Sequence, residues 1–157
     1  MAKTISIQFM RNDKTVTNFP EAGTKPVIVV TMKPSAANNN TVDIGGKTKQ
    51  VYALIDTGAD NYYVDQMLVS ELDLPATAGI KTIQLVSGIS ESNTTMHNAI
   101  MTVDEIAHSF GTRFCSIKTS EFGHGYQVIL GCDFIRRGTL TMDPINRVFT
   151  LTFPDDI

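Results

Sequence analysis

Short apolar stretches separated by turn-forming residues follow one another along the whole sequence, and this pattern constrains the fold more than any other feature. Ile5, Ile7 and Phe9 alternate with polar residues, which predicts a half-buried strand. Val27–Met32 is rich in β-branched residues and lies between two prolines, which predicts a buried strand. Only Gln66–Leu72 has a helical pattern. The sequence therefore predicts an all-β barrel or sandwich with one or two short helices.

The remaining stretches give the order of the other expected elements. Asp65 precedes the helical stretch as an N-cap, and Pro75 ends it. A second helical turn is expected at Cys132–Arg137, and the polar stretch 35–40 is expected to be a loop. Further expected elements are a tight turn at Gly45-Gly46, strands at Val51–Ile55, Thr82–Val86, Thr94–Val103 and Gln127–Leu130, and a hairpin of Leu140–Met142 with Val148–Phe153.

Length and composition limit the classes of protein to which the chain can belong. Its 157 residues suit a single domain over 1–157, with 1–25 as a candidate N-terminal extension. The net charge of −3 provides no basic surface for nucleic acid, and no apolar run is long enough to cross a bilayer. The start of the chain lacks the regions of a secretory signal, so we expect a cytoplasmic protein.

The cysteines and histidines predict neither a disulfide scaffold nor a metal site. Two cysteines are too few for such a scaffold, and they have no partner ligands at zinc spacing. Cys115 lies in an apolar-alternating stretch, which favours a buried thiol. The three histidines, His97, His108 and His124, are widely separated, so each is expected at the surface or in the core rather than on a metal. The second cysteine is Cys132. No cofactor is expected.

One segment indicates chemistry: an apolar strand that ends on a carboxylate and a glycine-containing turn. Residues 53–60 read Ala-Leu-Ile-Asp-Thr-Gly-Ala-Asp. The tripeptide Asp56-Thr57-Gly58 alone fits an ordinary turn, because aspartate before glycine is a common turn former. However, an aspartate at the edge of a core is partly desolvated, and this environment suits acid–base chemistry. A second apolar segment followed by glycine, at 128–135, favours the chemical interpretation.

These two segments, in this order, resemble the retropepsin-like aspartic proteases, the family of retroviral proteases and their cellular relatives. The matching pieces are 54–60 (LIDTGAD), a hairpin centred near 87–89, and 128–135 (VILGCDFI), and the resemblance extends over about 27–153. It implies a small closed β-barrel of the retropepsin type, with one or two short helices and a flap hairpin. It also implies an aspartic endopeptidase that hydrolyses peptide or protein substrates without a cofactor.

Peptide hydrolysis by this chemistry requires two carboxyl groups, one charged to activate water and one protonated to polarise the carbonyl. The chain has one Asp-Thr-Gly, so the simplest dyad is formed across the axis of a homodimer. By resemblance the chain ends build an intersubunit sheet, with Val148–Phe153 as the candidate strand; an ordinary barrel strand is the alternative.

The resemblance assigns a role to each matching residue. It implies that Asp56 is catalytic and that Thr57 links the two active-site turns across the dimer. Gly131 permits close packing against the Asp-Thr-Gly turn. The substrate would contact the Gly58 carbonyl, the acidic residue Asp60, the pocket residue Ile129, and Gly88 and Ile89 at the flap tip.

Two features depart from the family pattern: the residue at position 132, and the flap at 87–93, which is poorer in glycine than in retroviral enzymes. Many retroviral members have an arginine at the position of Cys132, paired with the acidic residue at the position of Asp60. We expect this ion pair to be absent here or to be supplied by another residue, with Arg136 and Arg137 as nearby candidates. The alternative function is a catalytically silent module of the same fold that binds peptides or dimerises, because a fold does not determine a function. The intact Asp-Thr-Gly favours the enzyme.

Overall fold

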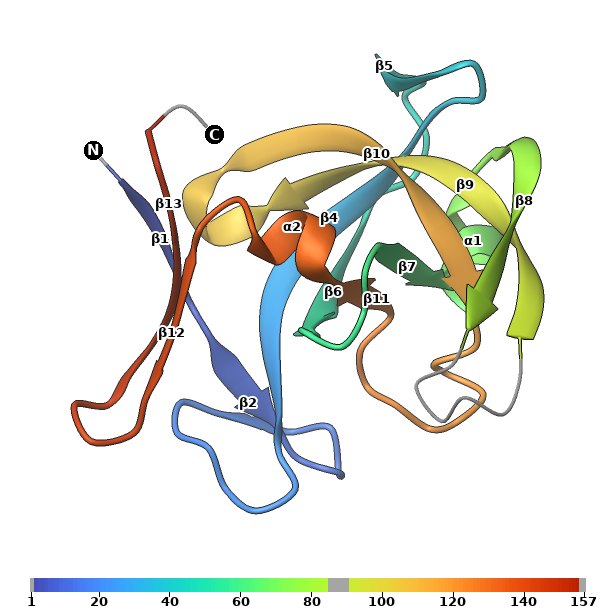
Figure 1. Cartoon of the computed structure of the whole chain (residues 1–157). Coiled ribbons are helices and arrows are strands. Elements are labelled where there is room, and N and C mark those ends of the chain that lie inside the picture. Colours follow the sequence, from blue (N-terminus) through green and yellow to red (C-terminus); the bar gives the residue numbers. More distant parts are fainter. Residues whose placement is uncertain (1, 85–90, 156–157) are drawn as a thin grey trace.

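A closed barrel of six strands forms the body of the protein. The computed structural model describes residues 2–84 and 91–155. Each barrel strand pairs with the next, and the last pairs with the first (Figure 1). In barrel order the strands are β4 (Lys25–Ala36), β6 (Lys49–Ile55), β11 (Val128–Leu130), β7 (Tyr62–Asp65), β10 (His108–Ile117) and β9 (Glu91–Val103). The predicted fold class is therefore confirmed.

The short strand β11 lies between β6 and β7, and this arrangement positions the Asp-Thr-Gly segment. β11 runs parallel to β6, with Ile129 opposite Leu54, and antiparallel to β7, with Ile129 opposite Tyr63. β6 and β7 are consecutive in the chain but are not paired with each other, because β11 occupies the place between them. The connection 56–61 must therefore cross the end of β11, where the backbone of β11 can hold it.

The interior of the barrel is apolar. Strand residues alternate between the two faces of a sheet, and the inward positions of β4 and β9, such as Val30, Met32 and Met101, are fully buried. Each such side chain stabilises the fold by about 1.5–3 kcal/mol through the removal of its surface from water. Phe114 and Phe134, also fully buried, contact Tyr62 edge-on, and this contact connects the barrel to the second helix.

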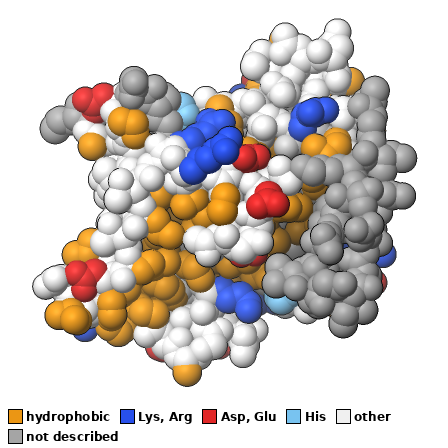
Figure 2. Space-filling view, in the orientation of Figure 1, with side chains coloured by type: hydrophobic (Ala, Val, Ile, Leu, Met, Phe, Trp, Pro, Cys, Tyr) orange, Lys and Arg blue, Asp and Glu red, His pale blue; other side chains and the backbone are white. Residues whose placement is uncertain are grey.

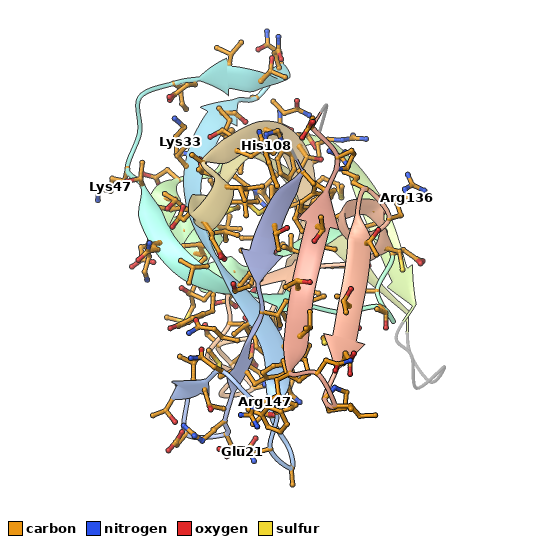
Figure 3. All side chains as sticks on the ribbon, turned by 90° about the vertical axis from the view of Figure 1, so that its left-hand side faces the viewer. Glu21, Lys33, Lys47, His108, Arg136 and Arg147 are labelled. Carbon is orange, nitrogen blue, oxygen red and sulfur yellow. The ribbon has the colours of Figure 1, made fainter. Side chains whose placement is uncertain are left out.

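The two ends of the chain meet in a separate three-stranded sheet. β13 (Val148–Phe153) lies between β1 (Lys3–Ser6) and β12 (Thr139–Asp143), antiparallel to both. Figure 3 looks onto this sheet. Phe149, Leu151 and Phe153 of β13 are buried. Since Phe153 packs edge-on against Phe134 with ring centroids 5.3 Å apart, the terminal sheet and the barrel share one core.

The smaller elements lie around the barrel. α1 (Gln66–Leu72) follows β7, and α2 (Cys132–Ile135) follows β11, close to the predicted positions of both helices. A short 3-10 turn, η1 (Asp104–Ile106), joins β9 to β10. The remaining strands are β2 (Gln8–Met10), β3 (Val16–Thr17), β5 (Asn39–Asp43) and β8 (Ala76–Gln84), and β8 forms a hairpin with β9.

Two expected boundaries were wrong because the prolines do not end β4. Pro26 pairs with Phe9, and Pro34 pairs with Ala99, so the strand continues past both. A proline can remain in a strand where its nitrogen is not needed as a hydrogen-bond donor. The expected loop at 35–40 is instead the end of β4, a tight turn and the start of β5.

Two further expectations need correction. β8 begins at Ala76 rather than Thr82, and β9 begins at Glu91 rather than Thr94, so the hairpin arms are longer than the sequence suggested. Asp65 occupies the N-cap position of α1, but its side chain makes no hydrogen bond to the helix. The expected tight turn at Gly45-Gly46 is a loop between β5 and β6, in which Gly45 has a φ of 71° and donates its N–H to Asp43 at 2.8 Å.

Candidate active site

Asp56 follows the last residue of β6 and marks the change from core to surface. Ile55 before it is buried, Asp56 is partly exposed, and Thr57 and Gly58 after it are exposed. The Asp56 N–H donates to the Leu130 carbonyl at 3.0 Å, which extends the pairing of β6 with β11 by one residue. Because the backbone is fixed up to this position, the carboxylate emerges from a rigid base.

The carboxylate of Asp56 is oriented by its own turn. Its Oδ1 accepts a hydrogen bond from the Gly58 N–H at 2.9 Å, and its carbonyl accepts one from the Ala59 N–H at 3.2 Å. A backbone donor that faces a carboxylate stabilises the ionised form and limits rotation of the side chain. One oxygen of the Asp56 carboxylate is thus hydrogen-bonded to the backbone, while the residue stays partly exposed to solvent.

The segment after β11 holds the loop 56–61 from behind. The N–H groups of Gly131, Cys132 and Asp133 donate to the carbonyls of Asn61, Ala59 and Asp60 at 2.9, 2.8 and 2.9 Å, respectively. A Cβ on Gly131 would lie 2.5 Å from the Ala59 carbonyl oxygen and 2.7 Å from that of Asn61. Only glycine permits this close approach of two backbones, as expected for Gly131 from the sequence.

Neither Cys132 nor the two nearby arginines form at Asp60 the ion pair that many retroviral members have there. The Cys132 thiol lies 3.3 Å from the Thr57 carbonyl and so contacts the loop directly. Arg136 pairs with Asp133 at 3.2 Å, within its own helical turn, and Arg137 lies over the Phe110 ring. Among residues 2–84 and 91–155, Asp60 is exposed and forms no ion pair.

An apolar cluster lies beside Asp56. Ile129 is partly buried and packs against a cluster of four buried residues, which consists of Met10, Val27, Leu54 and Tyr126. Burial raises the pKa of the Tyr126 phenol, and the negative charge of Asp56 raises it further, which indicates that the two groups lie near each other. Figure 2 shows hydrophobic side chains across the middle of the face that it draws.

The structure brings most of the sequence-predicted site residues together. Asp56, Thr57, Gly58 and Asp60 lie on one loop, Gly131 packs directly against it, and Ile129 belongs to the adjoining cluster. Gly88 and Ile89 lie outside the described residues. Tyr126 and Met10 were not identified from the sequence. Tyr126 precedes β11 by two residues, and this short distance in the sequence could have indicated that Tyr126 lies near the site.

Neither a metal-binding cluster nor a membrane-crossing helix is present in the described part of the chain. It contains no group of three or more His, Cys, Asp or Glu side chains arranged to hold a metal ion. None of its helices has the length and apolar character needed to cross a membrane.

Comparisons with known proteins agree with this geometry. A crystal structure of a retropepsin-like aspartic protease from Rickettsia conorii superimposes with a TM-score of 0.54 over 98% of this chain and 92% of the other, at 12% sequence identity. This similarity supports the fold. No curated protein matches the sequence significantly. The family model for retroviral aspartyl proteases matches residues 36–142, from the end of β4 into β12. This match covers more than half of the chain, and the chain therefore belongs to the retroviral aspartyl protease family.

Proposed function

We propose that the protein is an aspartic endopeptidase whose dyad consists of Asp56 from two copies of the chain. The observation that supports this most strongly is the Asp56 carboxylate itself, which is partly exposed, oriented by the Gly58 N–H and placed beside an apolar cluster. In the dyad, one ionised carboxylate removes a proton from the attacking water. The other carboxyl, protonated, polarises the scissile carbonyl.

The need for a second copy follows from the carboxylates near the loop. Asp133 lies on α2, where it pairs with Arg136, and Asp60 lies on the same loop as Asp56 but is exposed. Neither belongs to a second Asp-Thr-Gly turn. A two-fold axis beside the loop places two equivalent carboxylates together without any further residue. The exposed Thr57 then lies where two such loops would meet.

The substrate proposed for this site is an extended peptide. Gly58 is exposed, so its carbonyl can accept a hydrogen bond from a peptide N–H, and Asp60 beside it can bind a further backbone donor. Ile129 and its apolar cluster would receive a hydrophobic side chain next to the scissile bond. The contribution of Gly88 and Ile89 stays a prediction.

The first experiment compares the wild type with Asp56→Asn. Amide and carboxylate have nearly the same shape, so the variant should fold and form the same assembly but lose cleavage of a diverse peptide library. Asp73→Asn is the matched control, because Asp73 is exposed at the end of α1 in a left-handed conformation that asparagine tolerates. Cleavage by Asp56→Asn near the wild-type rate would contradict the proposal.

The same experiment separates the enzyme from a binding module. If the wild type binds library peptides and cleaves none, the silent peptide-binding function is favoured instead. Loss of cleavage on addition of EDTA would indicate a metal-dependent mechanism. Light scattering on the same samples gives the mass, and activity per chain should fall on dilution because each monomer holds half a site.

A further inference from the structure

Asp65 is a buried carboxylate that the proposed chemistry does not use. It is 1% exposed, and the described residues supply no Lys, Arg or His ion pair to it. Its oxygens accept hydrogen bonds from the Ser120 N–H at 3.2 Å, from the Ser120 hydroxyl, and from the Gln127 side-chain amide at 3.4 Å. All three donors belong to the segment 118–127, which connects β10 to β11.

Asp65 makes these hydrogen bonds to a distant segment, although the N–H groups of α1 lie next to it in the sequence. Asp65 stands at the N-cap of α1, where an aspartate normally accepts a hydrogen bond from a helix N–H. It makes no such bond and turns toward Ser120 instead. A buried carboxylate is costly unless it is hydrogen-bonded, so the position of Ser120 and the burial of Asp65 depend on each other.

The backbone fixes the other end of the same segment. The Gln127 carbonyl accepts from the Asp65 N–H at 2.8 Å, and the Gln127 N–H donates to the Tyr52 carbonyl at 3.1 Å. By contrast, the carbonyls of Thr119 and Ser120 accept bonds from within the segment, from Phe122, Gly123 and His124. The Asp65 side chain therefore connects the outer part of the segment to the barrel.

The segment carries Tyr126, an aromatic side chain near Asp56. Tyr126 stacks on His124 with ring centroids 4.9 Å apart, and it is buried in the apolar cluster beside Asp56. On its far side the segment meets the β2–β3 region. A Cβ on Gly125 would lie 2.7 Å from the Met10 sulfur and 2.9 Å from the Lys14 side chain, so little lateral movement is free.

We propose that Asp65 is a positioning residue that, through Ser120 and Gln127, sets the segment 118–127 and with it the position of Tyr126, the wall of the side-chain pocket proposed beside Asp56. The inference rests on the proposed peptidase function and adds a residue outside the catalytic loop that determines the shape of the proposed side-chain pocket. Asp65 belongs to β7 and does not hold the Asp56 loop. Weakening its hydrogen bonds should therefore impair peptide binding and leave the chemical step unchanged.

The experiment uses four variants and a reporter. Ser120→Ala removes one donor, and Ser120→Thr keeps it. Asp65→Asn places an amide donor against the Gln127 amide. Asp104→Asn is the matched control, since Asp104 likewise accepts from a hydroxyl, on Thr31 at 2.8 Å, and from a glutamine amide, on Gln50 at 2.7 Å, but at η1. The chain contains no tryptophan, so Tyr126→Trp introduces a single fluorophore into the wall in each background.

Two readouts decide the outcome. Ser120→Ala and Asp65→Asn should raise KM for a peptide with an apolar residue at the scissile bond by roughly two- to tenfold, the effect of one lost hydrogen bond, with little change in kcat. In the reporter background both should increase acrylamide quenching of the introduced tryptophan. Ser120→Thr and Asp104→Asn should match the wild type in both readouts. Circular dichroism verifies that each variant is folded. If Asp65→Asn does not fold, Ser120→Ala still tests the inference.

Unchanged quenching in both Ser120→Ala and Asp65→Asn would overturn the inference, as would an equal effect of Asp104→Asn. A fall in kcat at constant KM would also overturn it, because it would place Asp65 in the chemical step. If the wild type cleaves no peptide, the proposed function fails, while the fluorescence readout still determines whether Asp65 positions the segment.

Discussion

At the scale of single residues, the geometry of the candidate site depends on close backbone contact. The loop 56–61 is positioned by three hydrogen bonds from the backbone of 131–133, and Gly131 is the residue that lets the two segments touch. In the proposed mechanism Asp56 contributes the chemistry, and its orientation comes from the Gly58 N–H and from this backing segment. Side chains that never meet a substrate can therefore alter the site.

Gly131→Ala should consequently destabilise the fold by about 1–3 kcal/mol, the usual cost of forcing one methyl group into a packed interior. The proposed activity should fall as well, because the added Cβ pushes against the Ala59 carbonyl on the loop 56–61. Urea unfolding measures the first effect and peptide cleavage the second. Gly45→Asn is the control: no atom lies within 4 Å of a Cβ there, and asparagine tolerates the positive φ. Equal stability of Gly131→Ala and the wild type would refute the close contact.

His108 provides a pH dependence that is independent of the dyad. Partial burial lowers the pKa of its imidazole, and the positive charges of Lys3 and Arg137 lower it further. The folded state therefore binds the proton less readily than the unfolded state, whose histidines titrate near ~6.5. The unfolded state takes up the proton first as the pH falls, so His108 makes the fold less stable below about pH 6.5 than above it.

The His108→Gln variant should remove this component. The difference in urea midpoint between pH 7.5 and pH 5.5 should be smaller in the variant than in the wild type, because glutamine does not titrate. The carboxylates contribute equally to both proteins and cancel in the comparison. An identical pH dependence of the two proteins would show that His108 titrates alike in the folded and unfolded states.

At the scale of elements, the terminal sheet changes the role available to the C-terminal strand. The hairpin of β12 and β13 was predicted from the sequence and is confirmed. Within one chain, however, β13 pairs with β1 on one side and β12 on the other. Both edges of β13 are already paired, so β13 cannot pair with a strand from a second copy of the chain. If the sheet continues between subunits, the strands that offer an edge are β1 and β12.

Truncation after Asn146 should therefore prevent folding. It removes Phe149, Leu151 and Phe153, which are buried and would each contribute about 2–3 kcal/mol. Their sum approaches the total stability of a typical domain, about 5–15 kcal/mol. Circular dichroism and proteolysis would report the loss. A truncated protein that is folded, dimeric and active would show that β13 is dispensable to the core.

The sequence predicted those elements whose residues specify them locally. The apolar runs of β6 and β11, the helix after Asp65 and the Asp-Thr-Gly turn were recognised because each depends on neighbours in sequence. Long-range partners determined the rest. Pro34 stays in β4 because it pairs with β9. The Asp65 side chain accepts a hydrogen bond from Ser120 rather than from the N-terminus of α1. Tyr126 belongs to the same apolar cluster as Met10, although the two residues are more than a hundred positions apart in the sequence.

At the scale of the whole molecule, the chain completes one barrel and half of the proposed active site. The family model begins at residue 36, yet residues before it supply β1, β2 and most of β4, and Ile5, Ile7 and Phe9 are buried in the main core. The N-terminal strands therefore belong to the same folded body as the matched region. What a single copy does not supply is a second Asp-Thr-Gly turn to face the first.

The central claim is that catalysis requires Asp56 from both copies, and mixing wild type with Asp56→Asn tests it most directly. The two proteins are combined at constant total concentration under conditions that allow subunit exchange, and the cleavage rate is measured against the wild-type fraction. A shared dyad predicts a rate that follows the square of that fraction, about one quarter of the full rate in an equal mixture, because mixed dimers are inactive. A rate directly proportional to the wild-type fraction, about one half in the equal mixture, would show that each chain acts alone and would contradict the account.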